Sequence, residues 1–448
     1  GVDMEACEPL CYNEKFMDEI AHEEHYSSLV DEAVYRILKA KFSLGLFENP
    51  SFDLEKAKET VGSQEAFDLT YEEEAKGATL LKNNGILPLK KGTKIFLVGP
   101  NAEMAQLGGI TYYAALEDYQ EKEAMSEKAI ATDKAFIDRF GKENVRVHKG
   151  CNFFRLDKKE LMRAQAQTAM EGADVIVFAG GNNSVGYSGG ENGGKNNPLM
   201  KYDAVTSSEG YDVTDIGLTE SQKGLLENLK KAAKPIVFLN YGGKPVSLEK
   251  ELDYLDAVLF CYGVGMLGNL AVCDILLGKI NPSGRLPFTV ARNAGQLPIF
   301  YNHYLPRGNY GREGNQEKPG QDYVFGPNSP LFPFGFGLSY SRFLYRELDV
   351  QKKGEDILAS ILIKNEGPMD GEHVVLLYGR TLTRDYVCIP SKRLVAFGRY
   401  FFKKDEEKTI VFKLTRNDFS YIGFDMKETL PEGVIEIEVE GIKKEIAL

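Results

Sequence analysis

The middle of this chain contains four short apolar runs, each closed by a glycine or asparagine turn. In chain order they are KIFLVGPNA, DVIVFAGG, PIVFLNYGG and AVLFCYGVG, with stretches of helical spacing between them. Uninterrupted apolar strands that alternate with helices predict a mainly parallel sheet covered on both faces. The functional loops of such sheets leave the carboxyl ends of the strands. We therefore expect functional residues in segments 99–102, 180–210 and 263–268.

The segments on either side of this sheet have different patterns. Residues 15–44 have apolar residues at helical spacing and Gly45 as a stop, and a second helix is predicted over about residues 63–81. After Pro287 the chain is rich in Pro, Gly and Tyr to about residue 340, which predicts a long connection. ASILIKNEG, HVVLLYGR, KTIVFKLT and VIEIEVEGI then alternate with a period of two, which predicts a small β-sandwich.

Size and charge narrow the class of protein. A chain of 448 residues suits about three domains. Its net charge of −12 disfavours nucleic acid and anionic membranes as partners, and no apolar run approaches transmembrane length. The N-terminal GVDMEACEPL has the features of neither a signal peptide nor a natural start, so export stays open.

The cysteines and histidines give no sign of a metal site or a catalytic triad. The six cysteines are scattered, which favours reduced thiols in a cytoplasmic protein, and Cys261 and Cys273 are predicted to be buried. Cys7 and Cys11 could form half of a metal site, but no second pair has ligand spacing. His22 and His25 share a helix face beside glutamates, and no metal or other cofactor is predicted.

Residues 263–268, GVGMLG, match the dinucleotide-binding fingerprint and follow a strand. This strand is the last of the sheet rather than the first, and residues 279–288 contain no acid to bind the ribose. Tight packing of a helix on the strand explains these glycines without a nucleotide. An NAD-dependent oxidoreductase is therefore only a third hypothesis.

One carboxylate stands out in the loop after the second of the four runs. Residues 180–195, GGNNSVGYSGGENGGK, contain seven glycines and three asparagines, and Glu209 follows just ahead of a predicted amphipathic helix. Such an excursion can extend an acid over a neighbouring site. The residues alone leave open that Glu209 is a solvated or helix-capping acid.

Several segments together resemble glycoside hydrolase family 3, the β-glucosidase and β-xylosidase group. In the order of that family they are GVDME, VDEAVYRILKAKFSLGLFENP, ATLLKNNGILPL, KIFLVGPNA, ADVIVFAGG, PIVFLNYGGKPVSL, NPSGRLPFTV, PLFPFGFGLSY and VVLLYGR. The resemblance implies the end of a (β/α)8-type barrel over residues 1–60, an α/β sandwich with its linker over 61–342, and a fibronectin type III-like domain over 343–448. It places the sugar between the first two domains.

The resemblance also implies a retaining mechanism with two carboxyl groups, one a nucleophile and the other a general acid/base. SEGYD, with Leu218 and Gln222 downstream, is similar to the acid/base context of the family, so Glu209 inherits that role. Val213 stands where the family usually has Arg, and Thr219 where it has Pro. Glu191, in the same loop, is the fallback.

The nucleophile is expected outside this chain. The family places it in a Ser-Asp-Trp/Tyr-like context upstream of the GVDME segment, and this chain has no such stretch and no Trp. Asp3 and Glu5 could line the site, but neither is assigned as nucleophile. The resemblance thus implies the C-terminal part of an exo-acting β-glycosidase, with a β-linked glucoside as the first substrate and a xyloside as the second. The barrel half would come from a second chain or a missing segment. The alternative is an inactive carbohydrate-binding or scaffolding remnant.

Overall fold

The computed structural model forms two compact units, residues 1–66 and 67–448. It describes residues 2–5, 9–10, 12–20, 23–51, 53–104, 129–153, 158–159, 161, 163–165, 172–183, 206–207, 212–303, 317–320, 323–382 and 387–448.

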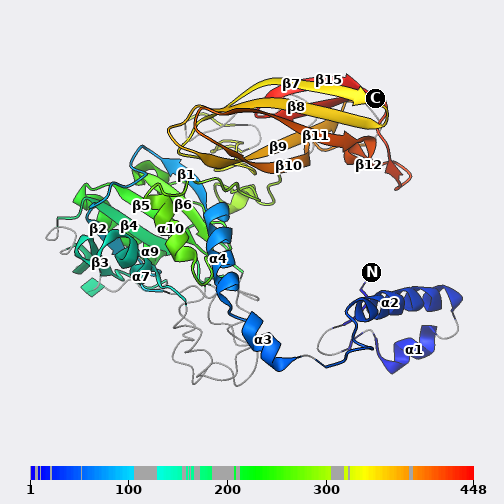
Figure 1. Cartoon of the computed structure of the whole chain (residues 1–448), viewed down its shortest axis with the longest axis horizontal. Helices are drawn as coiled ribbons and strands as arrows, with labels where there is room; N and C mark the ends of the chain where they lie inside the picture. The colour runs from blue at the N-terminus through cyan, green and yellow to red at the C-terminus, as the bar shows by residue number, and fades with distance from the viewer. Residues whose placement is uncertain are drawn as a thin grey trace. The chain divides into compact units, whose positions relative to one another are not determined.

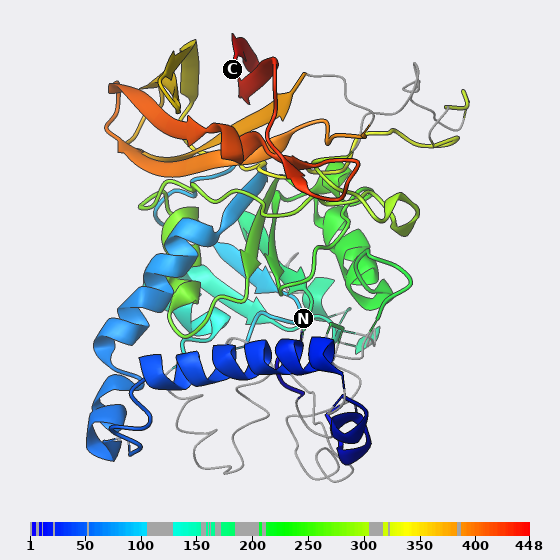
Figure 2. The same cartoon turned by 90° about the vertical axis from the view of Figure 1, so that its right-hand side faces the viewer.

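The first unit is helical wherever it is described. Its helices are α1 (Glu14–Ile20), α2 (Glu24–Ser43), which is the long dark-blue helix of Figure 2, and α3 (Leu54–Thr60). The single helix predicted over residues 15–44 is wrong, because Glu23 has extended φ and ψ angles of −118° and 100° and begins α2 as its N-cap. The predicted stop is confirmed, since Gly45 has a left-handed φ of +68° that favours glycine. No strand occurs among the described residues of this unit, so the barrel end stays a prediction.

A six-stranded sheet forms the centre of the second unit (Figure 1). Its strands are β1 (Thr79–Asn83), β2 (Ile95–Val98), β3 (Val145–His148), β4 (Val175–Gly181), β5 (Ile236–Tyr241) and β6 (Ala257–Tyr262). The order is β1-β6-β5-β4-β2-β3, and all neighbours are parallel except β1 and β6. The four apolar runs are therefore confirmed as neighbouring parallel strands.

Helices cover both faces of this sheet. They are α7 (Thr132–Phe140), α9 (Glu220–Leu229) and α10 (Gly268–Leu276). Successive residues of a strand point to opposite faces, and in β2 Ile95 and Leu97 join the core beneath α7 and α10. Phe96 and Val98 join the core beneath α9. Burial on both faces explains why these strands are apolar without alternation.

The predicted helix over residues 63–81 is too long. Helix α4 (Gln64–Gly77) ends at Gly77, and β1 begins two residues later. The consecutive residues Leu80 and Leu81 are both buried, but Leu80 joins the core under α7 and α10 while Leu81 joins the core under α9. Only a strand between two cores can bury two adjacent leucines in this way.

Glu74 on α4 is a buried acid without a charged partner. Its side chain lies against α10, where a Cβ atom placed on Gly268 would be 3.2 Å from Cβ of Glu74. The residue is 6% exposed, and its Oε1 atom has no hydrogen-bond partner among the described residues. Burial raises the pKa of Glu74 well above its ordinary value of 4.5, because a charged carboxylate is costly in an apolar environment.

Replacing Glu74 with Gln is expected to make stability less dependent on pH. With a raised pKa in the folded chain, the stability contributed by protonated Glu74 is complete below the unfolded-state pKa. It is lost as the pH rises through the folded-state pKa, at up to about 1.4 kcal/mol per pH unit. Melting curves of both proteins from about pH 4 to about pH 9 test this. The Gln variant should gain stability over the wild type as pH rises, and a constant difference would contradict the prediction.

The C-terminal part of the second unit is a β-sandwich. Its strands are β7 (Phe343–Lys353), β8 (Asp356–Asn365), β9 (Gly371–Thr381), β10 (Arg393–Phe402), β11 (Glu407–Thr415), β12 (Tyr421–Ile422), β13 (Glu428–Thr429), β14 (Val434–Val439) and β15 (Ile442–Ala447). Sheets of order β10-β9-β14-β15 and β11-β8-β7 enclose one apolar core, and β12 pairs with β13. Burial alternates along β8, as the period of two in the sequence predicts.

Short helices complete the described secondary structure: η1 (Lys142–Asn144), η3 (Lys230–Ala232), η4 (Leu252–Tyr254), η5 (Ala294–Gln296) and η6 (Arg416–Phe419). Between α10 and β7 the described chain contains only η5, which agrees with the predicted connection.

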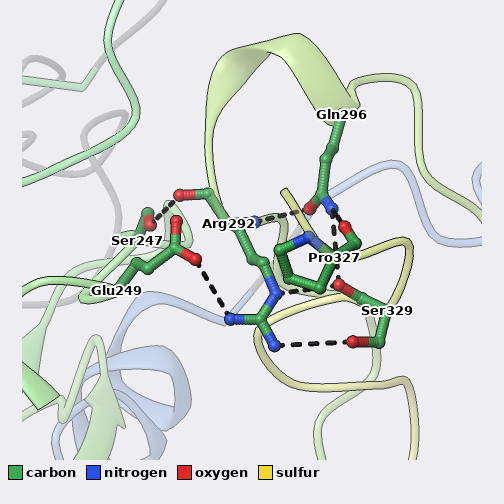
Figure 3. Close-up of polar contacts among 6 residues, drawn as sticks. All are labelled: Ser247, Glu249, Arg292, Gln296, Pro327 and Ser329. Atoms are coloured by element: carbon green, nitrogen blue, oxygen red, sulfur yellow. Dashed lines mark hydrogen bonds and ion pairs between the residues drawn. The ribbon is translucent and has the colours of Figure 1, made fainter. Parts of the chain in front are cut away.

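Side-chain hydrogen bonds, together with an isolated bridge between Val290 and Phe332, fix this connection, as Figure 3 shows for the side chain of Arg292. The Arg292 guanidinium donates to Oε1 of Glu249 at 3.1 Å and to the carbonyl of Ser329 at 2.9 Å. Gln296 accepts from the Arg292 backbone N–H at 2.8 Å and donates to the carbonyl of Pro327 at 3.1 Å. These bonds satisfy backbone groups that lack a sheet partner.

Polar contacts also join the sandwich to the α/β part. Asn281 donates to the carbonyl of Asp370 at 3.4 Å, and the hydroxyl of Ser341 donates to the carbonyl of Met369 at 2.7 Å. Arg399 on β10 donates to the hydroxyl of Ser283 at 2.6 Å and to the carbonyl of Lys76 at 3.0 Å. The two parts of this unit are therefore held together by specific hydrogen bonds.

Candidate functional site

The carboxyl end of β4 is held by a buried glutamine. Gln222, on α9, is fully buried, and its Oε1 accepts from the N–H of Gly181 at 2.9 Å. Its Nε2 donates to the carbonyl of the same residue at 2.9 Å, so this one side chain satisfies both backbone groups of Gly181. Since buried unpaired backbone groups cost about 1–3 kcal/mol each, Gln222 fixes the point from which the glycine-rich excursion departs.

The two described sides of this excursion meet at Asn183. The N–H of Asn183 donates to the hydroxyl of Thr206 at 2.8 Å, and its carbonyl accepts from the N–H of Thr206 at 2.9 Å and of Ser207 at 3.2 Å. On the neighbouring residue, the side chain of Asn182 donates to the carbonyl of Lys244 at 2.8 Å. Thr206 and Asn183 are both buried, so this junction is a fixed part of the carboxyl edge.

Thr219, where the resemblance predicts a proline, begins α9 as its N-cap. Its hydroxyl donates to the carbonyl of Phe153 and accepts from Nε2 of Gln222 at 3.3 Å. Its φ of −64° is the angle that a proline would supply. Thr219 therefore preserves the start of α9 despite the change in residue type.

A cavity of about 420 Å³ opens at this edge. Its described lining includes Asn182, Thr206, Asp212, Asp215 and Lys244. A hydrogen bond from the N–H of Gly217, at 2.8 Å, and the charge of Lys223 lower the pKa of Asp215. Asp215 is thus an ionised carboxylate at neutral pH, which makes it unsuited to donate a proton.

The structure leaves the predicted acid/base residues untested. Glu209 and its fallback Glu191 lie outside the described residues, and so do Cys7, Cys11 and His22. Asp212, three residues after Glu209, and Ser207, two residues before it, are described. Sequence reasoning did not identify Thr206 or the role of Gln222, although a glutamine on the apolar face of a predicted helix was the available signal.

Asp3 and Glu5 take part in local contacts within the first unit. Asp3 receives two hydrogen bonds from the Arg36 guanidinium, at 2.7 and 2.8 Å, and these bonds lower the pKa of Asp3. Oε2 of Glu5 accepts from the N–H of Tyr12 at 2.9 Å. A bidentate pair holds Asp3 as an anion facing arginine, so the structure gives no reason to assign it as a nucleophile.

Among the glycines of residues 263–268, the predicted close packing is confirmed for Gly268 alone, since an added Cβ atom would meet nothing within 4 Å at Gly263 and only Thr70, at 3.5 Å, at Gly265. A Cβ atom on Gly268 would lie 2.8 Å from Cβ of Val264 and 3.2 Å from that of Glu74, both too close. Gly265 has a left-handed φ of +63°. Cys261 and Cys273 are confirmed as fully buried. Within the described part of the chain, no group of three metal-binding side chains occurs, and no helix combines the length and apolarity needed to cross a bilayer.

Comparison with known families identifies the class of protein that this architecture represents. The glycosyl hydrolase family 3 C-terminal domain matches residues 78–340, and the fibronectin type III-like domain matches residues 373–441. The first match alone spans more than half of the chain, and the chain belongs to glycoside hydrolase family 3.

Individual relatives agree with this assignment. The periplasmic beta-glucosidase of Salmonella typhimurium is 29% identical over 434 residues, which are 91% of this chain and 53% of that protein. A beta-xylosidase of Formosa agariphila is 28% identical over 432 residues, or 93% and 54%. The crystal structure of a beta-glucosidase from Listeria innocua superposes with a TM-score of 0.78 at 27% identity, covering 97% of this chain and 57% of that one. This chain thus spans about half the length of the relatives it matches.

Proposed function

We infer that this chain is the C-terminal part of a retaining, exo-acting β-glycosidase and that Glu209 is its general acid/base. The names of the matched relatives, beta-glucosidase and beta-xylosidase, support the reaction and its β-linked substrate. The sequence context SEGYD supports Glu209. The single observation that carries the proposal is the fixed junction of Asn183 with Thr206 and Ser207 at the carboxyl edge of the sheet, because Glu209 follows Ser207 by two residues in the sequence.

The proposed reaction divides between two carboxyl groups. A carboxylate outside this chain attacks the anomeric carbon while protonated Glu209 donates its proton to the glycosidic oxygen, and the aglycone leaves. Glu209, now an anion, then takes a proton from water as the water oxygen attacks the anomeric carbon and releases the enzyme carboxylate. Carboxyl groups alone perform both steps, and therefore the mechanism needs no cofactor.

The first unit supports the proposal that a barrel half completes the site. Helix α2 exposes a series of large apolar side chains, with Tyr35 62% and Phe42 57% exposed. Others on the same helix are Tyr26, Leu29, Val34 and Leu38. Apolar surface of this extent is typical of a surface that another segment covers. The matched relatives have about twice the length of this chain, which supports the proposal that a further segment of the protein, or a second chain, covers this surface.

Joint production of this chain with its barrel half tests the proposal. The reading frame upstream of Gly1 is expressed together with residues 1–448, and the product is assayed with p-nitrophenyl β-glucoside and β-xyloside. We expect the lone chain to be inactive and the assembled protein to release p-nitrophenol, faster from the glucoside. A preference for the xyloside would select the alternative substrate that the beta-xylosidase relatives indicate. An assembled but inactive protein would reject the glycosidase and leave the carbohydrate-binding remnant.

The cellular location of the protein has two candidates. The predicted cytoplasmic location stays a prediction, and the periplasmic relative gives export as the alternative. Fractionation of the native source with an antibody against this chain distinguishes the two.

A further inference from the structure

A cavity of about 850 Å³ lies where residues 333–345 meet the sandwich strands β9 and β14 and the turn into β15. Its size falls within the range of small-molecule sites, which is about 300–1,000 Å³. Polar side chains in its wall include Arg285, Tyr345, Tyr378 and Glu440. We propose that this cavity is a binding site for a neutral mono- or disaccharide, separate from the carboxyl edge of the sheet.

Arg285 brings an unpaired charge to the cavity wall. Its guanidinium donates to the carbonyl of Gly284 at 3.0 Å and to Nδ1 of His373 at 3.2 Å, which leaves other N–H groups unused. It makes no ion pair with any described carboxylate. Burial lowers the pKa of Arg285, and the nearby charge of Glu440 offsets this only in part. Unused donors on a partly buried cation are costly unless a ligand or water accepts from them.

His373 lies between Arg285 and Tyr345 and forms a hydrogen bond with each of them. Because a guanidinium can only donate, Nδ1 of His373 must be the acceptor and Nε2 must carry the proton. Nε2 lies 2.6 Å from the hydroxyl of Tyr345, so that hydroxyl oxygen accepts and its own hydrogen stays free to donate. Burial, followed by the charge of Arg285, lowers the pKa of His373 to about 3, which keeps the ring neutral. Tyr345 is therefore a donor available to a ligand.

Tyr378 and Glu440 supply the remaining polar groups. Tyr378 is only 8% exposed, and its hydroxyl makes no hydrogen bond with any described residue. The carboxylate of Glu440, in the β14–β15 turn, likewise has no ion-pair or hydrogen-bond partner among them. Glu440 lines the same cavity as Tyr345 and Tyr378, and after burial its charge is among the causes that raise the pKa of both hydroxyls.

This set of groups selects the chemical class of the ligand. Glu440 disfavours an anion and Arg285 disfavours a cation, while Glu438 and Lys392 pair with each other at 3.9 Å. A sugar hydroxyl both donates and accepts, so adjacent hydroxyls can satisfy Glu440 and Arg285 together. The rings of Phe334 and Phe336 in the wall offer apolar surface for the C–H face of a pyranose. A neutral saccharide fits all of these groups at once.

Calorimetric titration of the whole chain with glucose and with cellobiose tests the site. We expect binding with a Kd on the order of 1 mM, weakened at least about tenfold by Tyr378→Phe and by Glu440→Gln, as a lost 1.4 kcal/mol gives. The matched control is Glu445→Gln, which removes the same charge from the exposed face of β15 and should bind like the wild type. Circular dichroism confirms that each variant is folded.

The outcomes separate this site from the proposed catalysis. Glu209→Gln should leave binding unchanged, and the titration needs no hydrolysis, so neither proposal fails with the other. Absence of binding by the folded wild type would overturn the inference. It would also be overturned by binding that Tyr378→Phe and Glu440→Gln leave intact, or by preferential binding of inorganic phosphate.

Discussion

Glu209→Gln is expected to lower kcat for alkyl β-glucosides by about 10²–10⁴-fold in the assembled enzyme, the usual contribution of a general acid/base. Glutamine retains the shape of the side chain but cannot protonate the departing oxygen, and a poor leaving group cannot depart without a proton. The measurement is initial rates of glucose release by the wild type and the variant, with the barrel half present in both.

The identity of the leaving group provides the decisive control. A dinitrophenyl β-glucoside has a leaving group that departs as an anion, so its first step should be much less impaired by Glu209→Gln. Azide, which needs no general base, should then accelerate turnover by forming the glycosyl azide. Glu191→Gln is the matched variant from the same loop. Loss of activity in Glu191→Gln with normal rates in Glu209→Gln would move the role to Glu191.

The sequence was sufficient to predict the parallel strands, because burial on both faces of the sheet requires apolar residues at successive positions. The run VIVFAGG has no polar side chain, and β4, which it forms, is buried at every position. The alternation of ASILIKNEG similarly appears as the alternating burial of β8. In both cases, whether a position is apolar or polar follows directly from whether it is buried or exposed in the fold.

Elements that depend on distant partners could not be predicted in this way. Leu80 and Leu81 fit a helix as well as a strand, and only pairing of β1 with β6 and the two separate cores decide for the strand. Gln222 could be placed on a helix, but its hydrogen bonds to Gly181 join residues 41 positions apart. The general acid/base role of Glu209 was predicted from a resemblance, and it stays a prediction because Glu209 lies outside the described residues.

Asp274→Asn is expected to destabilise the second unit by about 3–5 kcal/mol, the usual cost of removing one member of a buried ion pair. Asp274, on α10, is 4% exposed. It pairs with Arg139 of α7 at 3.0 Å and with Lys279 at 2.8 Å, and it accepts from the hydroxyl of Tyr71 of α4 at 2.9 Å. An asparagine would leave the partly buried Arg139 with only the more exposed Asp138 as its anion and place an amide N–H₂ group among donors. The measurement is the urea midpoint of unfolding, followed by circular dichroism.

Asp253→Asn is the matched control, since it makes the same chemical change at an exposed position in η4. Exposed substitutions of this kind usually change stability by no more than about 0.5 kcal/mol. Because Asp274 joins α4 and α7 to α10, its loss should also speed amide exchange in all three helices, whereas Asp253→Asn should leave them protected. Equal midpoints for Asp274→Asn and Asp253→Asn would show that the three donors find other acceptors or water. The charge cluster would then contribute nothing to holding these helices together.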